Sequence, residues 1–373
     1  MNPPRREAVS ADPPPRNAKP TRRDFALMAG AAAMIPDGLR AQASAPLVIA
    51  EGGASIERPW GTTPAYELAV RQGADFIAAD LVASQDGALL ARPDNDISAS
   101  TDVAARSQFA ARRVSRIVDG RSVSGWFTED FTLAELKSLT CRGLASKSRG
   151  ASAAFDGKWP ILTFQEVIDL ARAASVRAGR VIGVCATLRR PSYFASLGLQ
   201  LEPRLADAIR VNGYDWPAAA MLARSFEVGS LKTLGALSRV RRVQMVRADG
   251  GPPDQPGARY ADMIGADGLK AMRGWADAIA ADPPLLLDLS GSKPAASGLA
   301  GRARAVGLGV QGTLDGEADI LPPAPFRPGD RQGFLMALFA SGIDALSCPT
   351  PSLAARARNA WLDESRRRAT RPG

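Results

Sequence analysis

Residues 46–97 read PLVIAEGGASIERPWGTTPAYELAVRQGADFIAADLVASQDGALLARPDNDI. This stretch contains a short apolar run at Leu47–Ala50, a helical pattern at Thr63–Gln72 and a second apolar run at Asp75–Val82. Two apolar runs joined by one helical segment are typical of parallel strands connected through a helix. Gly87–Arg92 is predicted to pair with the second strand. The stretch therefore predicts an α/β fold.

The same alternation of apolar runs and helical segments continues along the chain. Further strands are predicted at Arg180–Ala186, Ala218–Ala223, Val240–Val246, Leu285–Leu289, Ala305–Val310 and Ile343–Ser347. Eight strands alternating with helices favour a (β/α)8 TIM barrel. The alternative is an open doubly wound sheet, but no G-x-G-x-x-G motif follows the first strand.

One long segment interrupts this alternation after the second strand region. Residues 98–160 are predicted to form an insertion in a barrel that spans residues 46–358. Thr132 and Thr163 are each followed three residues later by a glutamate, Glu135 and Glu166. This spacing predicts a capping box at the start of two helices.

The first 45 residues are typical of an export signal and not of a folded domain. Arg22-Arg23 precede the apolar run Met28–Ile35, and small residues follow at 41–45. This order predicts a twin-arginine signal peptide after a disordered N-terminus, and hence a periplasmic or secreted protein. The chain ends in a predicted basic tail, residues 359–373.

The composition excludes several classes of partner. The net charge of +9 falls to +6 without residues 1–43, and basic and aromatic residues do not alternate as in nucleic-acid-binding surfaces. No apolar stretch after residue 45 is long enough to span a bilayer. Cys141, Cys185 and Cys348 have no metal-binding spacing; small buried side chains are the favoured interpretation, although one pair could form a disulfide. Protein partners and oligomeric state stay open.

The sequence contains no histidine. Histidine is the side chain that titrates nearest neutral pH and the most frequent general acid or base. Mechanisms that use an imidazole are therefore excluded for this chain.

Several motifs resemble, in order, those of the glycerophosphodiester phosphodiesterase family, particularly its longer exported members. The resemblance covers about residues 46–358 and is carried by VIAEGGA (48–54), PWGT (59–62), IAADLV (77–82), QDGAL (85–89), ARPDNDI (91–97), FTEDFTLAELK (127–137), ILTFQE (161–166), RPSYF (190–194), GLQLE (198–202) and SFE (225–227). The resemblance implies a TIM barrel. It also implies phosphodiester hydrolysis with two histidines, a phosphate-binding arginine and lysine, and three carboxylates that hold a divalent cation.

Most positions of that chemistry carry other residues in this chain. The resemblance places Glu51 and Pro93 where the family has its two histidines, and Gly52 where it has the arginine. Trp60 and Ala78 stand at two carboxylate positions. Thr187-Leu188-Arg189 replaces the E-x-K pair, and Gln311 replaces a later histidine, whereas Asp80 is kept.

The residues that remain give a short set of candidates. Glu51 and Asp80 are the candidate catalytic residues and the candidate ligands of a weakly bound Ca²⁺ or Mg²⁺, although no cofactor is expected. The favoured interpretation is that they and Glu227 pair with arginines. The candidate ligand-binding residues are Arg92, Arg189, Arg190, Glu227 and Trp60, with cavity filling the preferred role of Trp60.

Three functions stay open on this basis. The first is an exported barrel that has lost the family reaction, a pseudoenzyme that binds a phosphate-bearing or other anionic ligand. The second is an active phosphoric diester hydrolase of lipid and glycerol metabolism with a rebuilt, histidine-free site. The third is a scaffold that binds a protein partner through the insertion.

Overall fold

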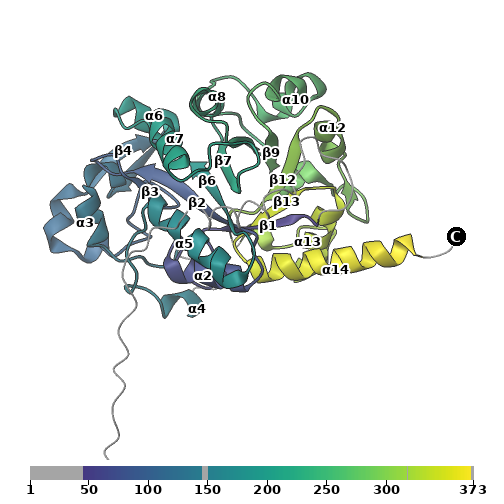
Figure 1. The fold of residues 1–373 in the computed structure, drawn as a ribbon, viewed down its shortest axis with the longest axis horizontal. Helices are drawn as coiled ribbons and strands as arrows, with labels where there is room; N and C mark the ends of the chain where they lie inside the picture. The colour runs from purple at the N-terminus through teal and green to yellow at the C-terminus, as the bar shows by residue number, and fades with distance from the viewer. Residues whose placement is uncertain (1–44, 145–149, 317, 371–373) are drawn as a thin grey trace, which may run out of the picture.

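The computed structural model describes residues 45–144, 150–316 and 318–370. Their main feature is a closed barrel of eight parallel strands surrounded by helices (Figure 1). The strands are β1 (Leu47–Glu51), β2 (Phe76–Ala83), β6 (Gly183–Leu188), β7 (Met221–Ser225), β8 (Arg241–Val246), β9 (Ala278–Ala281), β12 (Gly309–Thr313) and β13 (Ala345–Cys348). The predicted TIM barrel is therefore confirmed.

The first strand closes the barrel. It pairs in parallel with β13, with Leu47 opposite Ala345, and in parallel with β2, with Ile49 opposite Phe76. The short strand β3 (Leu89–Ala91) pairs antiparallel with the end of β2, as the sequence predicts.

One predicted strand is wrong. Leu285–Leu289 lies outside the barrel, in helix α11 (Pro283–Leu286) and the first strand of a small hairpin, β10 (Leu287–Asp288) and β11 (Ala295–Ala296). Two prolines begin α11, and Leu286 and Leu287 pack in the outer core. The sixth barrel strand is β9, whose four small or branched residues gave a weaker apolar signal than the leucines. Three other strands begin further along the chain than predicted, β6 and β7 by three residues and β12 by four.

Helices cover the outside of the barrel. They are α2 (Thr63–Arg71), α5 (Phe164–Ala178), α6 (Pro191–Ser196), α7 (Leu201–Val211), α8 (Val228–Leu237), α9 (Tyr260–Met263), α10 (Ala266–Met272), α12 (Leu299–Ala305), α13 (Arg331–Ala340) and α14 (Pro351–Ala369). Residues 359–369, predicted as a tail, continue α14, whose end extends beyond the barrel (Figure 1).

The part of the insertion that contains β4 and α3 lies on the side of the barrel opposite the end of α14 (Figure 1). It contains the 3₁₀ turns η2 (Val103–Ala105), η3 (Ser107–Arg112) and η4 (Thr128–Asp130), the hairpin of β4 (Val114–Val118) and β5 (Arg121–Gly125), and the helices α3 (Leu133–Lys137) and α4 (Gly150–Ala153). Both predicted capping boxes are present, at α3 and α5.

Side chains from alternate positions of the strands fill the inside of the barrel. Successive strand residues point to opposite faces of a sheet, so every second residue points inward. The inner apolar cluster contains Ile49, Phe76, Ala78, Cys185, Leu222, Val243, Met245, Ala280 and Ala345. Two residues further along four of these strands, Glu51, Asp80, Thr187 and Arg224 occupy the next inward position, which places polar groups at the carboxyl end of the barrel.

Three further expectations concern the signal segment, membrane-spanning helices and the cysteines. The predicted signal segment, residues 1–45, lies outside the described residues except for Ala45. Among the residues that the structure describes, no helix is long and apolar enough to cross a membrane. Cys141, Cys185 and Cys348 are free thiols and buried.

Candidate functional site

A cavity of about 520 Å³ opens at the carboxyl end of the barrel strands, where TIM barrels carry their functional residues. We call it the barrel-mouth cavity. Its polar wall consists of Glu51, Asp80, Arg189, Arg247, Asp282, Thr313, Asp315 and Asp319, and its apolar wall includes Trp60, Met245, Leu289 and Phe334. The sequence-predicted candidates Glu51, Trp60, Asp80 and Arg189 therefore share one cavity.

A buried ion pair closes the floor of this cavity. The Nη2 atom of Arg224 donates to both carboxylate oxygens of Glu51, at 3.0 and 2.8 Å. Arg224 also donates through Nε to Thr187 Oγ1 at 3.0 Å and through Nη1 to Ser347 Oγ at 3.2 Å. The Arg224 side chain is fully buried and that of Glu51 is 6% exposed. Because Ser347 also donates to Glu51, the carboxylate is held by three contacts from two strands.

Sequence reasoning missed Arg224. The expected pairing of Glu51 with Arg92, Arg189 or Arg190 is wrong, because the partner comes from β7, across the barrel. The signal was present: Arg224 is two residues beyond the buried Leu222 on a strand with period-two alternation, which points its side chain inward. An inward arginine requires an acidic partner, and Glu51 is the inward carboxylate of β1.

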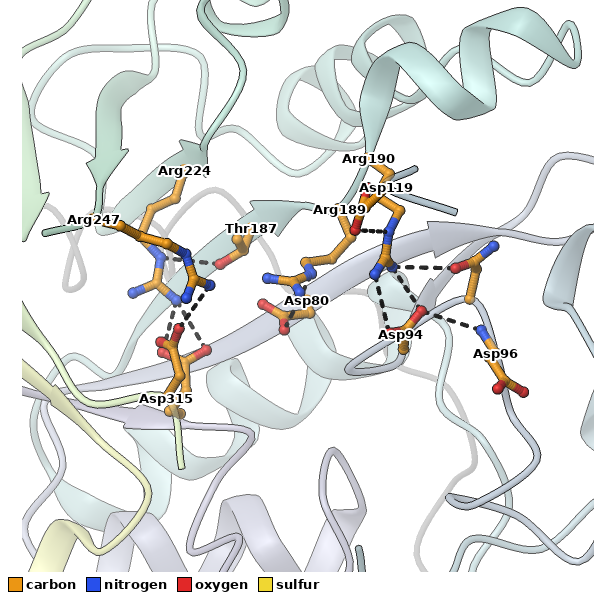
Figure 2. Close-up of polar contacts among 12 residues, drawn as sticks. Asp80, Asp94, Asp96, Asp119, Thr187, Arg189, Arg190, Arg224, Arg247 and Asp315 are labelled. Atoms are coloured by element: carbon orange, nitrogen blue, oxygen red, sulfur yellow. Dashed lines mark hydrogen bonds and ion pairs between the residues drawn. The ribbon is translucent and has the colours of Figure 1, made fainter. Parts of the chain in front are cut away.

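Asp80 and Arg189 form a looser pair on the cavity wall. The Nε atom of Arg189 lies 3.9 Å from Asp80 Oδ2, beyond hydrogen-bond distance. Burial raises the pKa of Asp80 to about 7; the charge of Glu51 acts in the same direction and that of Arg189 opposes it. Figure 2 shows Arg189 extending towards Asp80 from the end of β6. The expected pairing of Asp80 with an arginine is thus present, but it is incomplete.

A second loose pair lies on the same wall. The Nη2 atom of Arg247 is 3.6 Å from Asp315 Oδ2, and its guanidinium stacks 4.6 Å above the centre of the Phe226 ring. Desolvation inside the cavity and the charge of Glu51 raise the pKa of Asp315 to about 6. Since 40% of the Asp315 side chain is exposed, solvent weakens this effect. Of these two carboxyls, Asp80 therefore has the pKa nearer neutral pH.

Trp60 and Gly52 fit together as a pair. The Trp60 indole is 5% exposed, and it lies so close to Gly52 that a Cβ atom there would be 2.1 Å from Trp60 Nε1. Gly52 also has a φ of +62°, which side-chain-bearing residues rarely adopt. The position that the resemblance assigns to an arginine therefore has no room for any side chain.

One buried hydroxyl in the cavity wall has no hydrogen-bond partner among the described residues. Thr313 is 4% exposed, lines the barrel-mouth cavity and leaves Oγ1 unpaired. A buried polar atom without a partner costs free energy, so a group bound in the cavity would be stabilised by this hydroxyl.

The other sequence-predicted candidates lie outside this cavity. Arg92 is fully buried and donates to the carbonyl oxygens of Trp60 and Ser100 and to Cys141 Sγ, at 3.1–3.4 Å. Arg190 pairs with Asp94 at 2.6 Å and Asp119 at 2.9 Å (Figure 2).

Glu227 is 3% exposed and accepts the Ser192 N–H at 2.9 Å. Burial raises its pKa to about 7, and the hydrogen bond from the Ser192 N–H opposes this rise. Arg190 and Glu227 line a neighbouring cavity that also includes Arg189.

The residues present do not fit the divalent cation that the resemblance implies. A Ca²⁺ or Mg²⁺ site requires several oxygen ligands that converge on one point. Both Glu51 oxygens are bonded to Arg224, and the described part of the chain contains no group of three or more acidic or cysteine side chains placed to share a metal ion.

The comparisons with known proteins converge on one family. A family model described as the Glycerophosphoryl diester phosphodiesterase family matches residues 53–272. The chain is 34% identical over 202 residues to glycerophosphodiester phosphodiesterase GDPD6 of Arabidopsis thaliana, which covers 51% of this chain and 52% of that protein. It is 25% identical over 196 residues to the glycerophosphodiester phosphodiesterase of Haemophilus influenzae, 50% and 51% of the two chains. The chain thus spans about half the length of these curated relatives.

Solved structures show the same fold. A glycerophosphodiester phosphodiesterase from Agrobacterium tumefaciens has a TM-score of 0.54 at 16% identity, over 83% of this chain and 99% of that one. An Oleispira antarctica phosphodiesterase, solved with the product sn-glycerol-3-phosphate, has a TM-score of 0.54 at 19% identity, over 84% and 97%. At these identities the likeness concerns the fold alone.

Proposed function

The chain belongs to the glycerophosphoryl diester phosphodiesterase family, and we propose that it is a binding member of that family, which holds a phosphate-bearing ligand in the barrel-mouth cavity without hydrolysing it. The observation that carries this proposal is that the guanidinium groups of Arg189 and Arg247 have donors free to bind a ligand. Both line the cavity, and neither makes a hydrogen bond to its acidic partner, at 3.9 and 3.6 Å.

The loss of hydrolysis is argued from what occupies the barrel floor. General acid–base catalysis of phosphodiester cleavage requires a group that can accept and return a proton. Glu51 stands at the first histidine position of the resemblance, and its carboxylate is fixed by Arg224 and Ser347. Both oxygens of this carboxylate therefore accept hydrogen bonds from the barrel floor, and a proton-transfer role at a bound ligand would require these contacts to break. Trp60 fills the space beside it.

Ligand binding is argued from the two arginines and the unpaired hydroxyl. Guanidinium groups bind phosphate through several parallel hydrogen bonds, and these two have free donors that face a cavity. Thr313 Oγ1 supplies another donor on the same wall. Asp80, with a pKa of about 7, is partly protonated at neutral pH, which reduces its repulsion of an anion and its hold on Arg189.

A second candidate function rests on that same carboxyl. A group with a pKa near 7 can act as a general acid or base at neutral pH without a histidine. A rebuilt phosphodiesterase would use Asp80 in this role beside Arg189. Binding is the preferred proposal because Glu51, the other candidate catalytic carboxylate, is bonded to Arg224 through both of its oxygens. A hydrolysis assay separates the two functions.

Isothermal titration calorimetry with orthophosphate and sn-glycerol 3-phosphate tests the binding proposal. We expect measurable binding by the folded chain, and Arg189→Gln and Arg247→Gln should each weaken it by about tenfold or more, because each removes charge-assisted hydrogen bonds. Arg210→Gln is the matched control, since Arg210 is an exposed arginine that pairs with Asp207 on α7. Unchanged affinity in both cavity variants, or no binding of either probe, would contradict the proposal.

We also propose export through the twin-arginine route, supported by the order of residues in the first 45 positions. Replacement of Arg22 and Arg23 by lysine should retain the precursor in the cytoplasm, as seen by cell fractionation. An undiminished periplasmic fraction would reject this route.

A further inference from the structure

A second cavity, of about 500 Å³, adjoins the barrel-mouth cavity beneath the hairpin of the insertion. We call it the hairpin cavity. Arg189 and Arg247 line both cavities, so the two volumes meet at this pair of side chains. A ligand held by the two arginines therefore has two directions in which to extend.

The two cavities differ in charge. The barrel-mouth cavity adds five acidic residues to the shared arginines, namely Glu51, Asp80, Asp282, Asp315 and Asp319. The hairpin cavity adds two further arginines, Arg121 and Arg190, against Asp119, Glu227 and Asp249. Arg190 and Asp119 pair with each other at 2.9 Å and Glu227 is buried with a raised pKa, which leaves Arg121 and Asp249. In the barrel-mouth cavity Glu51 pairs with Arg224, which leaves four acidic residues. An anionic extension is thus favoured in the hairpin cavity.

Arg121 is a further cation of this cavity that no described residue engages. Within the described part of the chain, its side chain makes no ion pair and no hydrogen bond, whereas Arg190 is bonded to two aspartates. Arg121 is the first residue of β5, directly beyond the turn Asp119-Gly120. Its guanidinium is therefore available to a ligand.

The turn that carries Arg121 is fixed to the barrel. Arg190, at the end of β6, donates from Nε to Asp119 Oδ2 at 2.9 Å and from Nη1 to Asp94 Oδ1 at 2.6 Å (Figure 2). Asp119 and Arg190 both have positive φ values, +50° and +48°, which are uncommon for residues with side chains. Arg116 of the same hairpin pairs with Asp130. The hairpin is thereby positioned before any ligand binds, which lowers the entropic cost of binding.

We infer that the ligand carries a second anionic group, which lies in the hairpin cavity and is bound by Arg121. This inference rests on the proposed function, since the first anionic group is the one held by Arg189 and Arg247. It assigns the insertion a role in recognition and defines the ligand class as small molecules with two separated phosphate or carboxylate groups.

A series of probes with one or two phosphates tests this inference. Calorimetry on the whole chain compares methyl phosphate with alkanediol bisphosphates whose chains have about three to six carbons. At least one bisphosphate should bind about tenfold more tightly than methyl phosphate, beyond the roughly twofold statistical gain of two ends. Arg121→Gln should abolish this advantage and leave the affinity for methyl phosphate unchanged.

Arg113→Gln is the matched control. Arg113 is an exposed arginine of the same insertion, it lies outside the lining of both cavities, and its loss changes the net charge equally. Equal weakening by Arg113→Gln and Arg121→Gln would show general electrostatic attraction and overturn the inference. Bisphosphates no tighter than methyl phosphate would also overturn it, with the proposed function intact. If methyl phosphate does not bind either, the proposed function itself fails.

Discussion

Arg224 determines the chemistry at the floor of the barrel, because it holds the carboxylate that stands at the first histidine position of the resemblance. A buried ion pair contributes little net stability, but removal of one partner leaves the other charge buried without compensation. The pair joins β1 to β7 across the barrel interior. Removal of one partner is therefore expected to lower stability and also to release the other side chain at the floor of the cavity.

We expect Arg224→Met to lower the free energy of unfolding by about 3–5 kcal/mol, since Glu51 remains buried and unpaired. The double variant Glu51→Leu with Arg224→Met should recover most of this loss. Urea denaturation measures both. Arg210→Met, at an exposed ion pair on α7, should change stability by less than about 1 kcal/mol. A single variant as stable as the parent chain would refute the pairing.

Asp80 makes stability depend on pH. Its pKa of about 7 in the folded state lies above the ordinary value of 3.8, so the folded chain binds this proton more tightly than the unfolded chain. Stability from this group is complete below about pH 4 and is lost as pH rises through about 7. The groups that act on it are Glu51, Arg189, Arg224 and Asp315.

Asp80→Asn removes the charge that is costly to bury. We expect the variant to be more stable than the parent chain above about pH 7, by on the order of 2 kcal/mol, with the difference vanishing near about pH 4. Denaturation curves across this range measure it. A difference that is constant with pH, or that has the opposite sign, would mean that Asp80 is ionised in the folded chain throughout.

At the scale of elements, the hairpin β4–β5 is the part of the insertion that reaches the barrel mouth. Its tip is joined to the end of β6 through the contact of Arg190 with Asp119. The Asp119 side chain is 55% exposed, so this contact contributes modestly, by less than about 1 kcal/mol.

Asp119→Asn should accelerate hydrogen exchange of the amides of residues 114–125 by about twofold to fivefold, because the tip loses its charged contact with the barrel. Exchange followed by mass spectrometry measures this. The same substitution at Asp207, on α7, is the control and should leave the hairpin unaffected. Equal exchange in Asp119→Asn and the parent chain would mean that other contacts hold the tip.

The sequence predicts most elements because strand, helix and turn signals are local. Seven of the eight barrel strands follow from apolar runs, and the capping boxes at Thr132 and Thr163 follow from spacing alone. Strand β9 was missed because four residues, three of them alanine, give little apolar signal beside the leucines of α11. The shift of β12 has a similar cause: the apolar run began in the end of α12, before the turn at Gly307.

The site was less predictable, because its contacts join distant parts of the chain. Glu51 and Arg224 are 173 residues apart, and Ser347 is 296 residues from Glu51. Arg224 and Arg247 lie outside the motifs that carry the resemblance, so the resemblance assigns them no role. Period-two alternation indicates that Arg224 points inward, but only the closed barrel shows which carboxylate it meets.

At the scale of the whole molecule, the barrel combines a family fold with a floor occupied by an ion pair and a tryptophan. The family model matches residues 53–272, and the two relatives described above, which match about half of this chain, are named as phosphodiesterases. This chain is expected to differ from those relatives in one respect: its cavity binds an anion, and the bond-breaking step does not take place there.

Hydrolysis of glycerophosphocholine by the purified chain beginning near Ser44 tests this claim most directly. It is measured with and without Ca²⁺ or Mg²⁺, with a histidine-containing member of the family as positive control. We expect no turnover above that of the Glu51→Ala and Asp80→Asn variants, and no increase on addition of either cation. Turnover by the parent chain that either substitution abolishes would contradict the account and establish a phosphodiesterase that works without histidine.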